Sequence, residues 1–424
     1  MNEIKLFSSS LLGEKYYKIN HQSGLEIYVW PKEMSTTYGI FSVNFGGSVT
    51  EYELDGEHFS LPQGCAHFLE HKLFDNPDGH NADDVFSALG AYVNAYTSND
   101  KTAYIFSATD NVRECLEQLI YFVTNPYFTK KTVQKEIGII VEEIRGCMDD
   151  PYDRCYLNML GGMYFNDPVK NEICGSERSI AKITPEMLYR CCEHFYNPAN
   201  MTLSVCGRIT PEEVIRIVDA TLNYSRSSKP SVKSFLEPRE VREAYIEKKM
   251  QVGKPLFAIG IKDTDIPADA RERYKKSEAV NMLLRIMFSE SGDFYMNMLE
   301  RGLVSPGFDV GYSSNDRTAY VMMSGESDDP KGLLNEIKAH VKKTLKQGID
   351  LSDFEREKKC LYASYLADFD STEDIAFVMN SSANDRIDIF TYTDMLDGID
   401  LDYVSELAGK MFADESIVLS VIYP

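Results

Sequence analysis

The stretch GCAHFLEHKLF, residues 64–74, decides how the rest of the chain is interpreted, because it carries His67, Glu70 and His71 in the order H-x-x-E-H. In a helix, side chains four residues apart lie on one face, so the two imidazoles would point the same way. Two such imidazoles can bind one zinc ion, which takes nitrogen ligands in a small tetrahedral shell. Glu70 lies on the same side and could accept a proton from a water molecule that the metal has made more acidic.

The alternative is a chance pairing of two histidines on a half-buried helix, in a chain that has 7 histidines. A chance pairing predicts no third metal ligand in a useful place. Zinc held by two histidines in an enzyme, by contrast, needs a third protein ligand and leaves one position for water. A metal site therefore requires a further ligand elsewhere in the chain.

A carboxylate on a second predicted helix, over residues 129–147, can fill that position. Glu136 and Glu143 lie two turns apart on one flank of its apolar stripe, whereas Glu142 points toward solvent. Periodicity alone favours equally a zinc ligand and an ordinary surface carboxylate at Glu143. If Glu143 binds the metal, Glu136 would lie behind a ligand and orient it. The stripe consists of four apolar residues, Ile137, Ile140, Val141 and Ile144.

Length and composition limit the class of protein. A chain of 424 residues indicates two or three domains. The net charge of -22 argues against a nucleic-acid partner, whose phosphates require a basic surface. No apolar run is long enough to cross a bilayer, and no N-terminal stretch has the pattern of a secretory signal. The 9 cysteines are scattered without a C-x-x-C pair, which favours reduced thiols and a cytoplasmic location.

The order of predicted elements mixes strands, hairpins and helices, so we expect an α+β fold of layered sandwiches and not a doubly wound parallel sheet. Residues 91–108 form a predicted hairpin, because turn-forming residues separate two strand-like runs. Four residues would begin helices, Asp110, Thr184, Thr210 and Ser352. Further strands are expected at 25–30, 39–45, 201–207, 306–312 and 318–324, and helices at 82–89, 110–123, 184–195, 276–287, 330–346, 352–367 and 401–412.

The second half of the chain repeats the first. GIFSVNF begins at position 39 and its counterpart PLFAIGI at position 255, while TLSV begins at 202 and VLSV at 418, so both pairs share one offset, close to half the chain length. The same offset carries His67, Glu70 and His71 to three apolar residues that could not bind a metal, Leu283, Ile286 and Met287. We therefore expect a zinc-bearing N-terminal domain over 1–224, a polar linker over 225–238 and a C-terminal domain over 239–424 that lacks the metal site.

Three motifs, GCAHFLEHKLF, VNAYT at 93–97 and KEIGIIVEEI at 135–144, together resemble the M16 metallopeptidases, which include pitrilysin, insulin-degrading enzyme and the β subunit of mitochondrial processing peptidase. Their H-x-x-E-H order reverses the commoner H-E-x-x-H. The resemblance covers the whole chain and looks closest to the short bacterial members. It implies that His67, His71 and Glu143 hold one zinc ion, that Glu70 is the general base, and that Glu136 matches the family's additional glutamate.

The resemblance also implies a substrate and a reaction. M16 peptidases bind a peptide as an added strand beside the metal, along a segment like VNAYT, which would involve Asn94 and Ala95 here. Asn94 could equally be a turn-capping residue. The implied function is a zinc-dependent endopeptidase that cleaves extended peptides or unfolded segments. The alternative is a non-catalytic scaffold or binding subunit, because the family also includes such members.

The chain departs from the family in its C-terminal half. Single-chain active members usually carry an Arg and a Tyr seven residues apart that reach the substrate carbonyl. Here that spacing falls on Arg301 and Phe308, or in another alignment on Met298 and Ser305, and neither pair supplies both groups. We therefore expect the chain to be the metal-bearing member of a pair whose second M16-like chain supplies the Arg and Tyr, or otherwise a homodimer.

Overall fold

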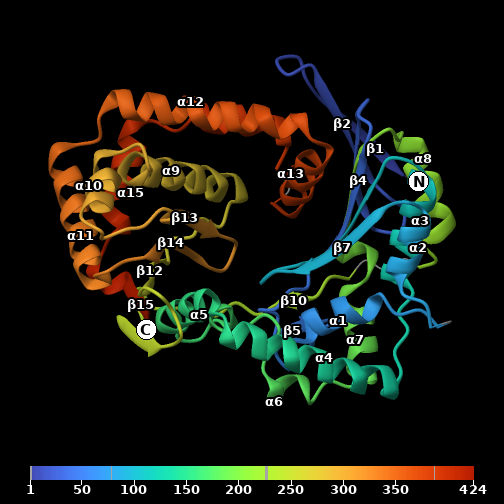
Figure 1. Cartoon of the computed structure of the whole chain (residues 1–424). Helices are drawn as coiled ribbons and strands as arrows, with labels where there is room; N and C mark the ends of the chain where they lie inside the picture. The colour runs from blue at the N-terminus through green and yellow to red at the C-terminus, as the bar shows by residue number, and fades with distance from the viewer. Residues whose placement is uncertain (1, 78, 225–227, 386) are drawn as a thin grey trace. The chain divides into compact units, whose positions relative to one another are not determined.

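The computed structural model describes residues 2–77, 79–224, 228–385 and 387–424. Its described strands form sheets of seven, five and three strands, with helices packed on them (Figure 1). This architecture confirms the predicted α+β fold. The chain divides into two compact units: the first extends to Ile144 and adds Glu172–Lys233 and Leu366–Phe390, and the second comprises Arg145–Asn171, Ser234–Tyr365 and Thr391–Pro424.

The seven-stranded sheet of the first unit has the order β1-β2-β3-β9-β4-β8-β7. Every residue of β4 and of β9 is buried, in keeping with their aromatic and β-branched composition. Strand β3 pairs with β9 in parallel, and the other neighbours are antiparallel. The strands are β1 (Glu3–Ser9), β2 (Glu14–Asn20), β3 (Glu26–Pro31), β4 (Thr37–Val43), β7 (Tyr92–Thr97), β8 (Thr102–Ala108) and β9 (Met201–Gly207).

The five-stranded sheet of the second unit repeats β3-β9-β4-β8-β7 as β11-β15-β12-β14-β13, with the same pairing directions. The repeat is therefore confirmed, although its registers differ. Leu203 pairs with Phe41, but Leu419, the counterpart of Leu203, pairs with Ile259 and not with Phe257, the counterpart of Phe41. A shift of two positions keeps the same side chains facing the core. The strands are β11 (Tyr245–Lys249), β12 (Leu256–Asp263), β13 (Asp309–Ser314), β14 (Ala319–Glu326) and β15 (Ile417–Tyr423).

Helices cover both faces of the seven-stranded sheet (Figure 1). Phe41 of β4 joins the apolar core that includes the buried face of α3, whereas Ser42, its neighbour, accepts a hydrogen bond of 2.7 Å from Asn380 of α13. Successive strand residues point to opposite faces, so α3 and α13 lie on opposite sides. The helices of this unit are α1 (Cys65–Leu73), α2 (Ala82–Ala88), α3 (Val112–Thr124), α4 (Lys130–Asp149), which begins here, α6 (Glu177–Ile180), α7 (Pro185–Phe195), α8 (Pro211–Thr221) and α13 (Thr372–Asp385).

Each unit receives one helix from the other half of the sequence. Helix α5 (Pro151–Met163) packs on β12 and β15 of the second unit, and α13 packs on β4 and β9 of the first. The single tryptophan, Trp30, is fully buried with its ring centroid 5.4 Å from those of both Phe369 and Phe390. The further helices of the second unit are α9 (Ala270–Phe288), α10 (Asp293–Glu300), α11 (Pro330–Gln347), α12 (Leu351–Ala367), which begins here, α14 (Tyr392–Asp397) and α15 (Leu401–Met411).

The predicted linker over 225–238 includes residues 225–227, which lie outside the described residues. Its later part is anchored: β10 (Ser231–Val232) pairs with β5 (Glu51–Leu54), which pairs with β6 (Glu57–Ser60). In the second unit, Glu237 accepts hydrogen bonds of 3.0, 2.5 and 2.8 Å from the backbone N–H groups of residues 165, 166 and 167. Glu237 also pairs with Lys262 at 2.7 Å, so this polar segment is a structural part of the fold.

Several local predictions failed. The β1–β2 hairpin and helices α5 and α13 were not expected. Helix α3 begins after Asn111, a left-handed residue without a side-chain cap, and not after Asp110. Helix α12 begins one residue before Ser352. Thr184 and Thr210 do cap α7 and α8, as predicted.

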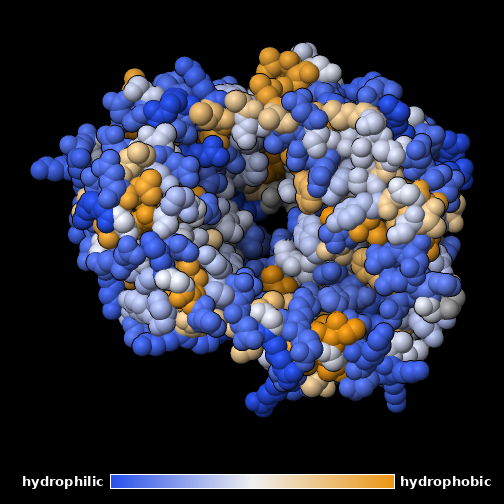
Figure 2. Space-filling view, viewed as in Figure 1, coloured by the Kyte–Doolittle hydropathy of each residue, from blue (hydrophilic) through white to orange (hydrophobic). Residues whose placement is uncertain are grey.

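Figure 2 shows a face on which hydrophilic residues predominate, in keeping with the net charge of -22. One apolar group projects at the tip of the β1–β2 hairpin, where Leu11 is 80% exposed. Among the helices that the structure describes, none combines the length and the hydropathy needed to span a bilayer.

Candidate metal centre

Gly64 fixes the position of α1, the helix that carries the H-x-x-E-H motif. It precedes the helix in the left-handed conformation, with φ of 88°, which glycine adopts readily. A Cβ atom at Gly64 would come within 2.5 Å of the carbonyl oxygen of Cys174. The start of α1 therefore packs directly against the backbone at Cys174, and only a glycine permits this approach.

Two imidazoles and one carboxylate converge beside α1. Nε2 of His67 lies 3.3 Å from Oε1 of Glu143, and Nε2 of His71 lies 3.7 Å from Oε2 of the same carboxylate. The two imidazole centroids are 4.6 Å apart. Glu143 is half-buried on α4, whereas Glu142 is exposed. The structure thus brings together the three residues named as zinc ligands, and the hydrogen bond with His67 lowers the pKa of Glu143.

Glu136, two turns before Glu143 on α4, contacts the other side of His71. Its Oε1 lies 3.1 Å from Nδ1 of His71, and its Oε2 lies 3.6 Å from Nζ of Lys72, whose side chain is only 1% exposed. Lys72 also pairs with Asp75. Burial alone would raise the pKa of Glu136, but the hydrogen bond with His71 and the charge of Lys72 outweigh it and lower the pKa. An ionised Glu136 accepts the Nδ1 proton of His71 and leaves Nε2 available to a metal.

Glu70 is held by the neighbouring sheet. Its Oε2 accepts a hydrogen bond of 2.7 Å from the hydroxyl of Thr97, the last residue of β7. Glu70 is half-buried on the helix between the two histidines. Burial lowers the pKa of His71, but the hydrogen bond to Glu136 and the charges of Glu70 and Glu143 outweigh it and raise that pKa. Thr97 lies within the quoted VNAYT stretch, although the sequence did not indicate its contact with Glu70.

Cys174 is a further potential donor that the sequence did not indicate. Its Sγ lies 3.7 Å from Nε2 of His67 and donates to Oε1 of Glu143 at 3.8 Å. One ligand atom from each of these three residues lies within 4.8 Å of the others. Cys174 precedes α6 in an irregular segment, where no periodic pattern could have pointed to it.

The donor atoms fit a zinc ion. On a tetrahedral zinc, a nitrogen and an oxygen ligand lie about 3.4 Å apart, as the usual bond lengths require. The observed separation between Nε2 of His67 and Oε1 of Glu143 is 3.3 Å. Oε2 of Glu143 is buried and has no hydrogen-bond partner within the described residues, so it retains lone pairs for a cation.

Strand β7, the segment expected to bind substrate, lies at the edge of the seven-stranded sheet, where it pairs with β8 alone among the described strands. Asn94 is exposed in the middle of this strand, which does not fit a turn-capping role. Its Oδ1 accepts a hydrogen bond of 2.9 Å from the backbone N–H of Ala95. Apart from this side-chain bond, the edge of β7 at Asn94 and Ala95 has no strand beside it among the described residues.

The two alternative Arg/Tyr positions in the second unit carry no tyrosine. Arg301 is exposed and pairs with Glu336 at 2.6 Å. Phe308 is buried, with its ring centroid 6.2 Å from that of Phe257 and 6.3 Å from that of Tyr295. Met298 of the second alignment is also buried, and Ser305 is half-buried. Phe308 thus has a packing role in this unit.

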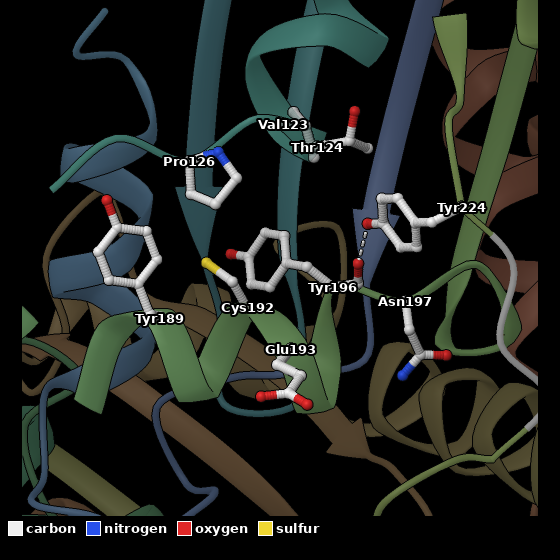
Figure 3. Close-up of a pocket in the computed structure, with 9 residues that line it drawn as sticks. All are labelled: Val123, Thr124, Pro126, Tyr189, Cys192, Glu193, Tyr196, Asn197 and Tyr224. Carbon is white, nitrogen blue, oxygen red and sulfur yellow. Dashed lines mark hydrogen bonds between the residues drawn. The ribbon is translucent and has the colours of Figure 1, made fainter. Parts of the chain in front are cut away.

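A pocket of about 290 Å³ lies elsewhere in the first unit, lined by the residues labelled in Figure 3. Tyr189 and Cys192 of α7 and Tyr196, the residue that follows it, point toward the side of the pocket where Pro126 lies, and the hydroxyl of Tyr224 donates to the backbone carbonyl of Tyr196. No residue of the candidate metal centre lines this pocket, so the two sites are separate.

Two family models match consecutive parts of the chain: the description "Insulinase (Peptidase family M16)" matches residues 60–177, and "Peptidase M16 inactive domain" matches residues 182–361. A Bacillus subtilis protein named as an uncharacterized zinc protease, YmfH, is 33% identical over 431 residues, which cover 99% of each protein. The chain belongs to the M16 peptidase family. Its half-length type is shared with that relative, since both align over almost their whole length.

Other M16 proteins are similar over most of the chain. The probable mitochondrial-processing peptidase subunit beta of Arabidopsis thaliana is 25% identical, covering 85% of this chain and 71% of that protein. The crystal structure of a putative M16-like peptidase from Alicyclobacillus acidocaldarius has a TM-score of 0.92 at 26% identity, covering 100% of this chain and 98% of that one. A Pseudomonas fluorescens structure described as an M16 inactive domain has a TM-score of 0.77 at 15% identity, which shows a shared fold alone.

Proposed function

We propose that this M16 chain is a zinc-dependent endopeptidase that cleaves extended peptides or unfolded segments. The observation that carries the proposal is the convergence of two imidazoles from α1 and one carboxylate from α4, at 3.3 and 3.7 Å. His67, His71 and Glu143 would hold one zinc ion. The names of the relatives as zinc proteases support this chemistry at the level of the family.

The surrounding residues have distinct roles in this proposal. When bound, zinc would polarise the scissile carbonyl and make water more acidic. Glu70 is the general base, which accepts the proton of the attacking water and delivers it to the leaving amine. Thr97 restrains the Glu70 carboxylate through its 2.7 Å hydrogen bond. Glu136 orients His71 from the side away from the metal.

The peptide would bind as an additional strand along the open edge of β7. Backbone groups at Asn94 and Ala95 would pair with it, which requires an extended substrate and demands little of its sequence. The amide of Asn94 already occupies the N–H of Ala95, so the incoming strand has to displace this side chain. Folded proteins cannot supply such a strand, which restricts the substrates to peptides and unfolded segments.

We also propose that the chain works as the metal-bearing member of an M16 pair, because neither Arg301/Phe308 nor Met298/Ser305 supplies both an Arg and a Tyr. The second chain would bring these groups, and a homodimer is the fallback assembly. In sequence terms the proposed division is a zinc-bearing domain over 1–224, a linker over 225–238 and a domain without metal over 239–424. A cytoplasmic location is proposed because the 9 cysteines are scattered along the sequence without a C-x-x-C pair.

The alternative is a non-catalytic scaffold, favoured by the missing Arg/Tyr pair. Zinc content and peptide cleavage of the chain and its Glu70→Gln variant distinguish the two functions. The endopeptidase proposal predicts one zinc per chain in both proteins, poor cleavage by the chain alone, and cleavage by wild type with a half-length M16 partner that Glu70→Gln abolishes. A scaffold would cleave with neither protein, even in the presence of that partner.

A further inference from the structure

Two glycines fix the thiol of Cys174 beside the candidate metal centre. Gly64 allows the carbonyl of Cys174 to approach the start of α1, as described above. Gly175 has φ of 81°, and a Cβ atom there would lie 2.6 Å from the carbonyl oxygen of Gln63. The backbone at Gln63 and Gly64 therefore packs closely against the backbone at Cys174 and Gly175, and this packing fixes the position of Cys174 relative to α1.

The distances from the sulfur match those of a metal ligand. Nitrogen and oxygen ligands lie about 3.6 Å from a sulfur ligand on the same tetrahedral zinc, given the usual Zn–S, Zn–N and Zn–O lengths. The observed separations of Sγ are 3.7 Å from His67 and 3.8 Å from Glu143. Together with the 3.3 Å separation between His67 and Glu143, these distances give three ligand–ligand separations close to those of a tetrahedral zinc site.

We propose that Cys174 is a fourth protein ligand of the zinc ion, an inference that rests on the proposed metal site. On binding, the thiol loses its proton to solvent and the thiolate sulfur forms a bond to the metal. His67, Glu143 and the thiolate of Cys174, whose ligand atoms lie within 4.8 Å of one another, would supply one nitrogen, one oxygen and one sulfur, and His71, whose Nε2 lies 3.7 Å from Oε2 of Glu143, would add the second nitrogen. A closed shell of four protein ligands is typical of structural zinc, whereas a catalytic site keeps one position for water.

The consequence is a site regulated by its own thiolate. Water or the substrate carbonyl has to replace the sulfur, or join it in a five-coordinate shell, before hydrolysis can proceed. The competing explanation is that Cys174 stays protonated and only donates a hydrogen bond to Glu143, as an ordinary buried thiol would. The two explanations differ in whether a metal–sulfur bond exists, which can be measured without any substrate.

Cobalt substitution of the full-length chain tests the bond. The zinc-free protein is loaded with Co²⁺ and its absorption spectrum is recorded. Visible d–d bands report binding of the ion, and an intense near-ultraviolet charge-transfer band reports a thiolate ligand. We expect both in the wild type, loss of the near-ultraviolet band alone in Cys174→Ala, and no change in Cys115→Ala, a matched control at another buried cysteine. Zinc affinity of Cys174→Ala should fall at least about tenfold, the lower bound seen even for outer-shell changes.

The outcomes separate this inference from the proposed function. Visible bands without a thiolate band in the wild type, or a thiolate band that survives in Cys174→Ala, would overturn the role of Cys174 and leave the three-ligand site intact. No cobalt binding by any variant would overturn both. A second measurement needs no mutation: bound zinc should protect Cys174 from alkylation, as read by mass spectrometry, without changing the reactivity of the exposed Cys360, and equal labelling of Cys174 with and without zinc would contradict the bond.

Discussion

Replacing Glu136 by Gln tests whether a carboxylate outside the ligand set controls the affinity for zinc. In the wild type, Oε1 of Glu136 lies 3.1 Å from Nδ1 of His71 and fixes the tautomer that leaves Nε2 available. A glutamine can still accept this hydrogen bond, but it carries no charge to strengthen it, and its amide can rotate to present N–H groups instead. The substitution therefore weakens the orientation of His71 without removing a ligand.

The expected effect is a loss of zinc affinity of about 10- to 100-fold, the range for partners of ligating histidines. This corresponds to about 1.4–2.7 kcal/mol of binding free energy. Competition of the metal-free protein with a chromophoric chelator gives the dissociation constant directly. Thermal unfolding of the metal-free variant is measured in parallel, because Lys72 loses one of its charged partners and keeps Asp75.

Glu142→Gln is the matched control, since Glu142 is an exposed carboxylate on the same helix, next to Glu143. Its zinc affinity should equal that of the wild type. The reasoning is refuted if Glu136→Gln binds zinc within about twofold of the wild type, well below the range of loss given above. It is also refuted if the loss equals that of His71→Ala, because Glu136 would then act as a ligand and not as an orienting partner.

Three further predictions concern the folded units. Glu237→Gln should lower the stability of the second unit by about 3–5 kcal/mol in calorimetry, because the buried ammonium of Lys262 loses its carboxylate partner, whereas the exposed Glu240→Gln should not lower it. Burial raises the pKa of Glu237, but Lys262 and three backbone N–H groups outweigh burial and hold this pKa below its usual value. The stability that ionised Glu237 contributes is therefore present above the pKa of the unfolded state and is lost as the pH falls through the pKa of the folded state. The difference in unfolding free energy between wild type and variant should thus become smaller in acid. Phe369→Ala should shift the emission of Trp30 to the red and cost about 3–5 kcal/mol, unlike Leu236→Ala at a 94% exposed position; an unchanged spectrum would contradict the packing. Chelation of zinc should leave the circular dichroism and the Trp30 emission unchanged, with a stability loss of about 2.7 kcal/mol if zinc had been at 100 times its dissociation constant.

Local sequence patterns predicted much of the candidate site. The spacing of His67 and His71 requires only the helical period, and the same period separates Glu143 from the exposed Glu142. Cys174 could not be found in this way, because its approach to His67 depends on two glycine conformations in segments far apart in sequence. Lys72 also gave no signal, since a lysine is normally a surface residue and is buried here only because carboxylates surround it.

The exchange of helices between the halves was beyond the reach of sequence patterns for a different reason. An apolar stripe shows that a helix is covered on one face, but it does not say which sheet covers it. Neither α5 nor α13 was predicted, and an apolar stripe in either helix would not have shown which sheet it packs on. The common offset of the paired motifs likewise predicted the repeat but not the register of its strands. The pairing of β12 with β15 is shifted by two positions relative to the pairing of β4 with β9, and such a shift keeps the same side chains facing the core, so the apolar pattern does not reveal it.

The repeat itself argues that the fold does not depend on the metal. Both units build the same order of five strands, yet α9 carries Leu283 and Met287 where the common offset places His67 and His71. Both of these apolar side chains are buried, as core packing favours. Buried polar groups cost stability unless they have partners, so histidines at these positions of the first unit lower its stability relative to apolar residues such as those in the second unit. Their presence beside Glu143 and Cys174 is explained if binding of a cation compensates for that cost in this unit.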